Sequence, residues 1–422
     1  MHNLQKIKKS LKRRSRAEKR FRWYGRIAIL LGLTAVLLLF VDIVSKGHGA
    51  FKATYIQLDI HYDSEQLGVS SLADSKELMQ ANWDALPKVA LRKQFADVTS
   101  RGDKRKLYGL ISNGAGFDLK DRLLANPLLL NQTETLWILA DDDIDTYYKS
   151  WLDADPYAAR LSKKQIQWID ELHQQDKIAL QFNANLFTRG DSREPEQAGI
   201  RGAVIGSMLT LLITLILSFP IGVAAAVYLE EFAPKNKFTD FIEVNINNLA
   251  AVPSIIFGLL GLAIFINFFH IPRSVPVVGG LVLTLMTLPT IIITSRASIK
   301  SVPPSIREAA LGMGASKHQV VLHHVLPLAL PGMLTGAIIG MAQALGETAP
   351  LLMIGMVAFI VDIPQSFTDP ATVLPVQIFL WSDSPERAFI EKTSAAIMVL
   401  LTFLMIMNIS AVWLRKRLER RW

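Results

Sequence analysis

One carboxylate stands inside a strongly apolar part of the chain, where burying a charge is costly. Glu347 lies within the apolar segment 332–357, and an ionisable side chain inside a membrane span indicates a functional site by default. Gln343 is one helical turn earlier on the same face. Thr348 could donate a hydrogen bond to a ligand, or only to the backbone of its own helix. These three side chains are candidates for a polar path through a membrane.

Arg296 is a fourth candidate for that path. It stands at the inner end of the apolar segment 277–295, where its positive charge could meet an anion. The alternative is a structural role, because Arg and Lys commonly mark the cytoplasmic end of a spanning helix. Both interpretations stay open, and the structural one is the commoner.

An acidic run resembles part of a calcium loop. Asp141, Asp143 and Asp145 alternate along "DDDIDT", but a calcium loop also requires Gly at its sixth position and Glu at its twelfth. Thr146 and Leu152 occupy those positions. The sequence therefore favours a solvated acidic turn.

The sequence supports no other metal site and no catalytic site. His323 and His324 are adjacent, so they point in different directions on a helix and are poorly placed to share a metal. The chain has no cysteine, which excludes disulfides and thiolate metal sites. It also lacks the pattern G-x-x-x-x-G-K-[ST] of a nucleotide-binding loop. We predict no catalytic residue, no metal ligand and no cofactor bound by this chain.

The composition indicates that a membrane positions these residues. Of the 422 residues 50% are hydrophobic and only 19% are charged, which is typical of a membrane protein. Six apolar segments have the length of a bilayer span, namely 27–44, 203–228, 247–269, 277–295, 332–357 and 395–413. A cleaved signal peptide is the alternative for the first segment, but its basic flank is long and further spans follow.

Both ends of the chain are basic. Residues 1–26 contain eleven Lys and Arg against one acid, and residues 415–422 form a second basic stretch. An even number of spans places both ends on one side, and the excess of positive charge predicts that this side is the cytoplasm. The arm 1–26 abuts an apolar run, so we predict a membrane topology signal and no nucleic-acid partner.

The segment between the first two spans has a soluble character. Residues 45–198 contain 19 basic and 23 acidic residues and no spanning run. "YIQLDIHY" (55–62) and "KIALQF" (177–182) alternate as half-buried strands do, and Ser162 and Gln165 have the spacing of a helix capping box. We predict a soluble α+β domain inserted after the first span, on the outer side of the membrane.

The stretch between the fourth and fifth spans is predicted to be two short helices on the inner side. Ser305 could cap the first helix, with Glu308 three residues later. Gly312 and Gly314 mark the break between the helices. The second helix would pack through the apolar residues Val320, Val321, Val325 and Leu326.

The spacing in this stretch resembles the coupling signature of ABC-importer permeases. A Glu-Ala-Ala run is followed by Gly six positions after the Glu, and then by Leu-Pro. The matching residues are Glu308, Ala309, Ala310, Gly314, Leu326 and Pro327. The family's usual aliphatic residue two positions before the Leu is His324 here. The resemblance implies that a coupling helix at about 303–327 docks in a cleft of a separate cytoplasmic ATPase subunit.

Three further stretches are similar to phosphate-importer permeases of PstA type. They are "GETAPLL" (346–352), "LAAVPSIIFGLLGLAIF" (249–265) and "LPVQIFLW" (374–381), and the resemblance covers about 200–414. It implies an α-helical polytopic membrane protein of six transmembrane helices with the ABC-importer permease fold. The soluble α+β periplasmic domain would be inserted between helices 1 and 2.

The chain would thus consist of five consecutive parts. They are a basic cytoplasmic arm (1–26), transmembrane helix 1 (27–44), the periplasmic insertion domain (45–198), a five-helix permease core (199–414) and a basic cytoplasmic tail (415–422). The resemblance implies a bacterial inner-membrane, multi-pass protein with both termini in the cytoplasm.

The same resemblance implies half of the translocation pore of an ATP-driven importer of inorganic phosphate. The partners would be a second phosphate permease subunit, two ATP-binding subunits that hold ATP and Mg, a periplasmic phosphate-binding protein and the lipid bilayer. This chain would not itself be an enzyme. PstA-type relatives often have an arginine where Gln343 stands, so another cation would have to meet the phosphate.

Two alternatives differ in cargo or in class. A permease of the same kind could carry molybdate, sulfate or an amino acid. A membrane sensor could bind a ligand in its periplasmic domain and signal inward through the basic arm, without an ATPase partner.

Overall fold

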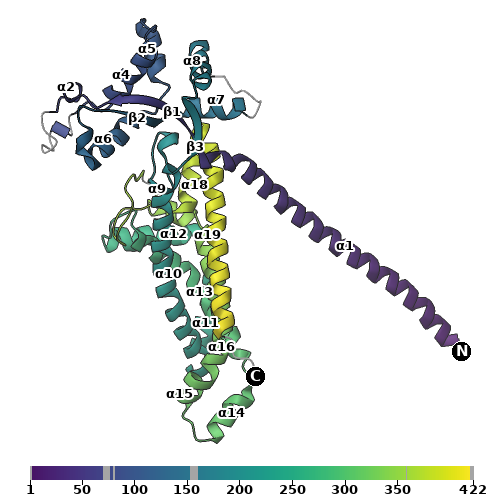
Figure 1. Ribbon diagram of the computed structural model, residues 1–422. Coiled ribbons are helices and arrows are strands. Elements are labelled where there is room, and N and C mark those ends of the chain that lie inside the picture. The colour runs from purple at the N-terminus through teal and green to yellow at the C-terminus, as the bar shows by residue number, and fades with distance from the viewer. Residues whose placement is uncertain (1, 70–76, 79–80, 153–159, 358, 419–422) are drawn as a thin grey trace.

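The computed structural model describes residues 2–69, 77–78, 81–152, 160–357 and 359–418. Residues 419–422 of the predicted basic tail lie outside this range. Figure 1 shows a sheet with short helices at one end, a bundle of long helices below it, and helix α1 (His2–Gly47) leaving the junction. We call residues 48–198 the sheet domain and residues 199–418 the bundle.

The sheet domain is built on three antiparallel strands in the order β2–β1–β3. These are β1 (Lys52–His61), β2 (Thr133–Leu139) and β3 (Ile178–Phe182). Tyr55 in the central strand β1 lies opposite Leu139 on one side and Ala179 on the other. Ile56, Leu58 and Ile60 of β1 are buried, as period-two alternation requires. Both strands predicted from alternation are confirmed.

Short helices cover the sheet. They are η1 (His48–Phe51), α2 (Ser64–Leu67), α4 (Ala85–Gln94), α5 (Arg101–Tyr108), α6 (Ala115–Ala125), η2 (Pro127–Leu129), α7 (Asp142–Leu152), α8 (Lys163–Gln174), α9 (Asn185–Thr188) and η3 (Pro195–Gln197). The capping box predicted at Ser162 and Gln165 is present at the start of α8. Apolar residues of these helices, such as Leu91 and Leu172, share one core with β1.

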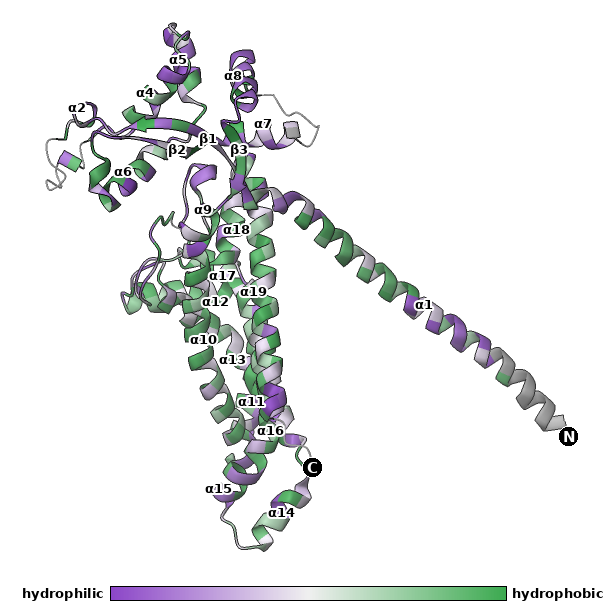
Figure 2. Cartoon of the chain, viewed as in Figure 1, coloured by the Kyte–Doolittle hydropathy of each residue, from purple (hydrophilic) through white to green (hydrophobic). Residues whose placement is uncertain are grey.

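The bundle contains the long apolar helices. In chain order its elements are α10 (Arg201–Val227), the π-helical turn η4 (Tyr228–Phe232), α11 (Lys237–Ala250), α12 (Ser254–Gly261), η5 (Leu262–Phe268), α13 (Pro276–Lys300), α14 (Pro304–Gly312), α15 (Lys317–Gln319), η6 (Val320–Val325), α16 (Leu326–Gly346), α17 (Ala349–Met353), α18 (Leu374–Ser382) and α19 (Ala388–Leu418). Figure 2 shows that the long helices of the bundle are hydrophobic over most of their length.

In the described part of the chain five helices are long and apolar enough to cross a membrane, or six if one bent pair forms a single span. The bent pair is α11 with α12–η5, whose axes meet at 102°. The segment 247–269, expected to be one span, is therefore broken. Pro253 is the N-cap of α12 at this break, whereas Pro220 and Pro289 lie inside continuous helices.

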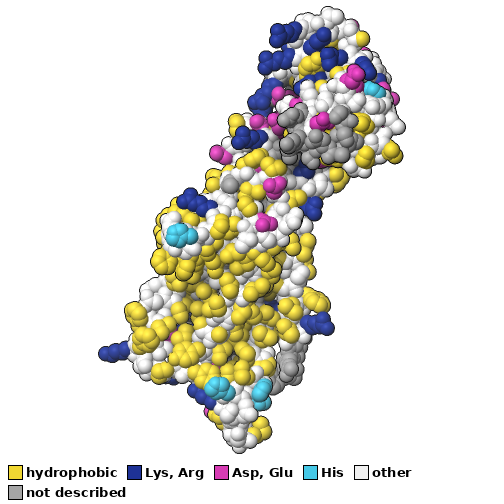
Figure 3. Space-filling model, turned by 90° about the vertical axis from the view of Figure 1, so that its left-hand side faces the viewer, with side chains coloured by type: hydrophobic (Ala, Val, Ile, Leu, Met, Phe, Trp, Pro, Cys, Tyr) yellow, Lys and Arg dark blue, Asp and Glu magenta, His cyan; other side chains and the backbone are white. Residues whose placement is uncertain are grey.

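Helix α13 lies at the centre of the bundle. Of its most apolar window 61% is buried, against 11% for α19 and 0% for α1. Small residues allow α10 and α13 to approach closely: a Cβ at Gly280 would lie 2.6 Å from the side chain of Ile213. Figure 3 shows hydrophobic side chains over the visible face of the bundle, as expected of a surface that faces lipid.

Polar contacts fasten the sheet domain to the top of α18 and α19. Lys392 of α19 donates from its ammonium group to the carbonyl oxygen of Ala198, at 2.6 Å. Two further contacts join Lys149 to Glu391 at 3.0 Å, and the indole nitrogen of Trp381 to Asp191 at 2.9 Å. Because these groups are partly or fully buried, the two parts of the chain are held in a fixed relation at this seam.

Candidate coupling and translocation site

The signature residues lie at the end of the bundle farthest from the sheet domain (Figure 1). α14 and α15 form a hairpin there, and Gly314 between them has φ +87°. Such a backbone conformation strongly favours glycine. The break predicted at Gly312 and Gly314 is therefore confirmed.

The cap predicted at Ser305 is wrong. α14 begins at Pro304, with Pro303 as its N-cap and no side-chain cap. Proline suits the first helical position because its missing N–H would have no partner there. The capping box of this hairpin lies at Ser316 and Gln319, where α15 begins.

The hairpin has a buried face and an exposed face. Ala310 is 2% exposed and packs with Val320 and Val325 of η6, so the predicted apolar face of the second helix is confirmed. The exposed residues of α14 and the turn after it include Glu308, Ala309, Leu311 and Met313. Exposed Leu and Met side chains next to a carboxylate are suited to contact with another protein.

Arg307 holds the first arm of the hairpin to the end of α10. Its guanidinium donates to Glu231 of η4 at 2.7 Å, and to the carbonyl oxygens of Val302 and Ile299 at 2.7 and 3.0 Å. The side chains of Arg307 and Glu231 are only 23% and 11% exposed. This partly buried pair fixes α14 to the α10 end and to the α13–α14 connection.

The second arm rests on an aromatic ring at the same place. The ammonium group of Lys317 lies 5.2 Å from the ring centroid of Phe232, and the ring of His318 lies 4.9 Å from it. α16 then starts at Leu326 with Pro327 in its first turn. Both arms of the hairpin are therefore anchored to η4.

Three of the four predicted pathway residues lie together at a helix break. α16 ends at Gly346, Glu347 has extended backbone angles, and Thr348 is the N-cap of α17. Gln343 is exposed one turn earlier, while Glu347 and Thr348 are half-buried.

The polar groups at this break lack partners. Among the described residues the Glu347 carboxylate forms no ion pair or side-chain hydrogen bond, and the Thr348 hydroxyl forms no hydrogen bond. A helix break at membrane depth is tolerated where it is buried in protein or lines a polar cavity. A break carrying an unpaired carboxylate is therefore a place for a ligand or for a second subunit.

Arg296, the fourth predicted pathway residue, lies away from the helix break at Glu347. It pairs with Glu243 of α11 at 2.6 Å and with Glu230 of η4 at 3.4 Å, and its side chain is 14% exposed. On the antiparallel α16, Gly332 packs against Ser298 of α13, so Arg296 is roughly 20 Å from the level of Glu347 at a helical rise of 1.5 Å per residue. In this structure its guanidinium is paired with two acids.

Sequence reasoning missed the acidic partners of these bases. Arg296 pairs with Glu230 and Glu243, and Arg307 pairs with Glu231. The signal was present as "YLEEF" (228–232), two acids directly after an apolar span on the side where bases accumulate. Burying a carboxylate next to an apolar span costs free energy unless the carboxylate is paired, so these two acids indicate basic partners on a neighbouring segment.

Two family descriptions match the chain. "Binding-protein-dependent transport system inner membrane component" matches residues 218–422, and a domain of unknown function matches residues 8–157. The probable ABC transporter permease protein YqgI of Bacillus subtilis is 31% identical over 248 residues, 56% of this chain and 83% of that protein. The phosphate transport system permease protein PstA of Haemophilus influenzae is 29% identical over 228 residues, 54% and 79% of the two chains.

Among solved structures, a chain of the inward-facing MetNI methionine ABC transporter aligns with a TM-score of 0.44 and 18% identity. The alignment covers 52% of the present chain and 96% of the other.

Proposed function

This chain belongs to the family of binding-protein-dependent transport system inner membrane components, as an ABC-importer permease of PstA type, and we propose that its cargo is inorganic phosphate. It forms half of the pore, together with a second, related permease subunit. The names of the relatives from Haemophilus influenzae and Mycobacterium tuberculosis, both phosphate transport permeases, support this cargo.

The observation that carries the proposal is the exposed face of α14 on a rigidly anchored hairpin. Glu308 has no ion-pair partner among the described residues, while Arg307 next to it is fixed to Glu231. This arrangement supports docking of α14 into a separate ATPase subunit. Closure of two such ATPase subunits on ATP and Mg then draws the coupling hairpins together and switches the access of the pore. This chain itself breaks no bond.

The pathway side chains are Gln343, Glu347 and Thr348. Phosphate is an anion, so an ionised Glu347 acts by orienting a cation or by accepting the remaining phosphate proton. Gln343 contributes hydrogen bonds without charge. Because Arg296 is held by two acids far from this level, the cation comes from the partner permease.

The proposed topology has six spans, with the bent pair α11 and α12–η5 counted as one. Figure 1 supports it, because α14 and the C-terminal end of α19 lie at one end of the bundle and the sheet domain at the other. Both termini are then cytoplasmic and the sheet domain is a periplasmic insertion. Protease added to spheroplasts should cut the sheet domain; protection of that domain would contradict this topology.

The cargo is tested in the complete complex. The chain, its partner permease, the ATPase subunits and the binding protein are reconstituted in vesicles, and ATP hydrolysis is measured with phosphate, molybdate and sulfate. Stimulation by phosphate alone is expected. Stimulation by another oxyanion would change the cargo, and ligand binding without any ATPase partner would favour a membrane sensor.

A further inference from the structure

A cavity of about 330 Å³ lies where the sheet domain meets the bundle. Its walls come from the end of α1, from η1, β1, α7 and β3, and from the start of α19. Three lysines and one histidine line it, against a single carboxylate, that of Glu391. Ligand pockets measure roughly 300–1,000 Å³, so this cavity has the size for one small polar group.

Two of the three lysines can offer their charge to such a group. Lys149 cannot, because its ammonium group lies 2.7 Å from Asp145 and 3.0 Å from Glu391 and is 11% exposed. Lys46 pairs only with Asp42, one turn earlier on α1, in an exposed contact that contributes little. The exposed Lys52 forms no ion pair or side-chain hydrogen bond among the described residues. The available positive charge is therefore that of Lys46 and Lys52.

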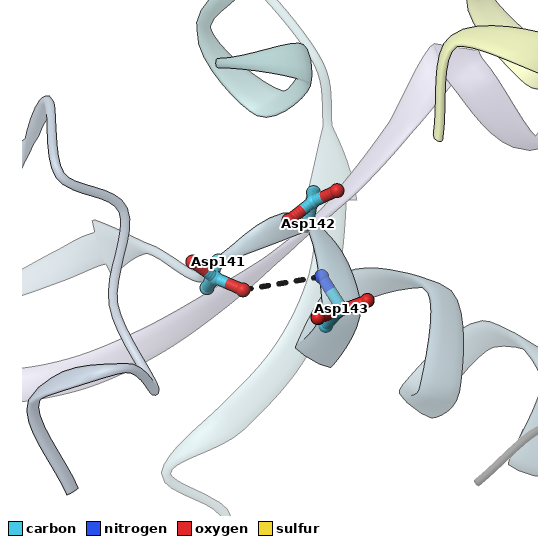
Figure 4. Close-up of side chains that lie close together, drawn as sticks. All are labelled: Asp141, Asp142 and Asp143. Carbon is cyan, nitrogen blue, oxygen red and sulfur yellow. Dashed lines mark hydrogen bonds between the residues drawn. The ribbon is translucent and has the colours of Figure 1, made fainter. Parts of the chain in front are cut away.

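The acidic start of α7 does not reach the cavity. Figure 4 shows Asp141, Asp142 and Asp143 close together, with Asp141 accepting a hydrogen bond from the backbone N–H of Asp143 at 3.2 Å. Acids at a helix start favour its dipole. Lys149 lines the cavity six residues after Asp143, roughly 9 Å along the helix axis at 1.5 Å per residue. The three acids thus leave the cavity open to an anion.

The cavity lies at the level of the lipid headgroups. Lys46 directly follows the apolar segment 27–44, and the apolar segment 395–413 begins just after the part of α19 that lines the cavity. The two helices touch here, because a Cβ at Gly47 would lie 2.9 Å from the backbone nitrogen of Ala395. Both spans therefore leave the hydrocarbon core, about 30 Å thick, at this height and enter the headgroup region.

Apolar surface adjoins the charged part of the cavity. Ile390, which is 56% exposed, and Leu180 belong to its lining. Phe182 lies opposite Lys52 in the sheet, is 65% exposed and stacks on Phe187 with 5.9 Å between the ring centroids. Exposed apolar side chains grouped beside lysines are typical of a surface that contacts a membrane.

Space for acyl chains lies on the membrane side of the cavity. Below its contact with α19, α1 leads away from the bundle (Figure 1), and 0% of its most apolar window is buried. For α19 the buried share of that window is 11%. Lipid therefore has access to the apolar faces of both helices directly beneath Lys46.

We propose that this cavity binds the phosphate group of an anionic phospholipid, such as phosphatidylglycerol, from the leaflet next to the sheet domain. Lys46 and Lys52 donate to the phosphate oxygens, as lysine does in many phosphate sites, and the acyl chains follow α1 and α19. Inorganic phosphate presents the same oxygens, but the apolar surroundings favour the lipid. Because Lys46 is on α1 and Lys52 on β1, the bound lipid links the first span to the sheet domain. This role is independent of the cargo.

The test uses the full chain with its partner permease, purified and stripped of lipid in detergent. Dioctanoyl phosphatidylglycerol, dioctanoyl phosphatidylcholine and sodium phosphate are added in turn, and bound molecules are counted by native mass spectrometry. We expect phosphatidylglycerol to bind this chain at least tenfold more tightly than the other two. Equal binding of phosphatidylcholine would overturn the charge recognition, and equal binding of sodium phosphate would overturn the lipid as the source. Failure of all three to bind would overturn the site.

Variants locate the lipid. Lys46→Gln and Lys52→Gln should each weaken phosphatidylglycerol binding about fivefold, because a lysine near a membrane surface contributes about that factor, and together about 25-fold. Lys52→Arg keeps the charge and should bind as the unmodified chain does. Lys106→Gln, at an exposed lysine of α5 outside the cavity lining, is the matched control. Undiminished binding in the double variant, or an equal loss in Lys106→Gln, would contradict the site.

Discussion

The guanidinium of Arg307 donates two hydrogen bonds to one carboxylate oxygen of Glu231, at 2.7 and 3.1 Å. The two residues lie 76 positions apart and join the short helix α14 to the end of α10. Arg307 also donates to the carbonyl oxygen of Ile299 near the end of α13 and to that of Val302 in the connection that follows, so the hairpin is held firmly to the bundle.

Arg307→Ala should uncouple ATP hydrolysis from uptake. Removing one partner of a buried ion pair costs about 3 kcal/mol, which is enough to loosen α14 from α10 while the membrane helices remain folded. The ratio of phosphate imported to ATP hydrolysed should fall several-fold in reconstituted vesicles. Lys300→Ala is the control, because Lys300 is 59% exposed and its ion pair with Glu230, at 3.5 Å, is a surface contact. Equal ratios in both variants would mean that the contact does not transmit force.

Glu308→Lys should prevent docking of the ATPase subunit. Glu308 is exposed on α14, so charge reversal leaves the fold intact and repels a basic group on the partner. We expect the ATPase to be lost on co-purification and uptake to cease, with normal membrane insertion. Ser305→Lys puts the same charge at another exposed position of α14 and should retain much of the activity. Normal uptake in Glu308→Lys would remove the coupling role of this residue.

Glu347→Gln should reduce transport much more than assembly. Without an intrachain partner among the described residues, the carboxylate stabilises little in this subunit, while in the pathway it orients a cation or takes a proton. We expect at least a tenfold lower maximal uptake rate with unchanged recovery of the complex. Gln343→Glu, which adds a second negative charge one turn away, should lower uptake further by repelling the anion. Unaltered uptake in both variants would exclude this break from the path.

Much of the local structure followed from short-range patterns in the sequence. The strand at 55–62 and the capping box at Ser162 and Gln165 were predictable, because alternation and capping depend on a few neighbouring residues. The break at Gly314 was predictable for the same reason, since a left-handed backbone favours glycine.

Other features could not be predicted from the sequence, because they depend on contacts between residues that are far apart along the chain. Hydropathy identified an apolar segment at 247–269, but hydropathy carries no information on the 102° bend within it, which lies at Pro253. The role of Arg296 depends on acids 53 and 66 positions away. The burial of Glu196 was not predicted either, because its hydrogen bond with Ser112 joins residues 84 positions apart.

The last prediction concerns Glu196, a buried carboxylate of the sheet domain. The stability of the sheet domain should fall as the pH rises from about 4.5 to about 7. In the folded chain burial, Asp142 and Glu194 raise the pKa of Glu196 from 4.5 to about 7, against the opposing effects of the Ser112 hydroxyl and Lys392. Over that window the folded state keeps a proton that the unfolded state has released.

The unfolded state therefore binds fewer protons, and the free energy of unfolding decreases with pH. The contribution is complete below pH 4.5 and lost above about 7; at 1.36 kcal/mol per pH unit it amounts to about 3 kcal/mol. Thermal unfolding of the chain as a function of pH should show this slope, and Glu196→Gln should make it less steep by raising stability at pH 8. The slope that remains should come from Asp141, whose pKa is raised to about 8. The control is Asp97→Asn, at an exposed acid of the same domain. An identical slope in Glu196→Gln and in this control would show that Glu196 does not have the raised pKa on which the prediction rests.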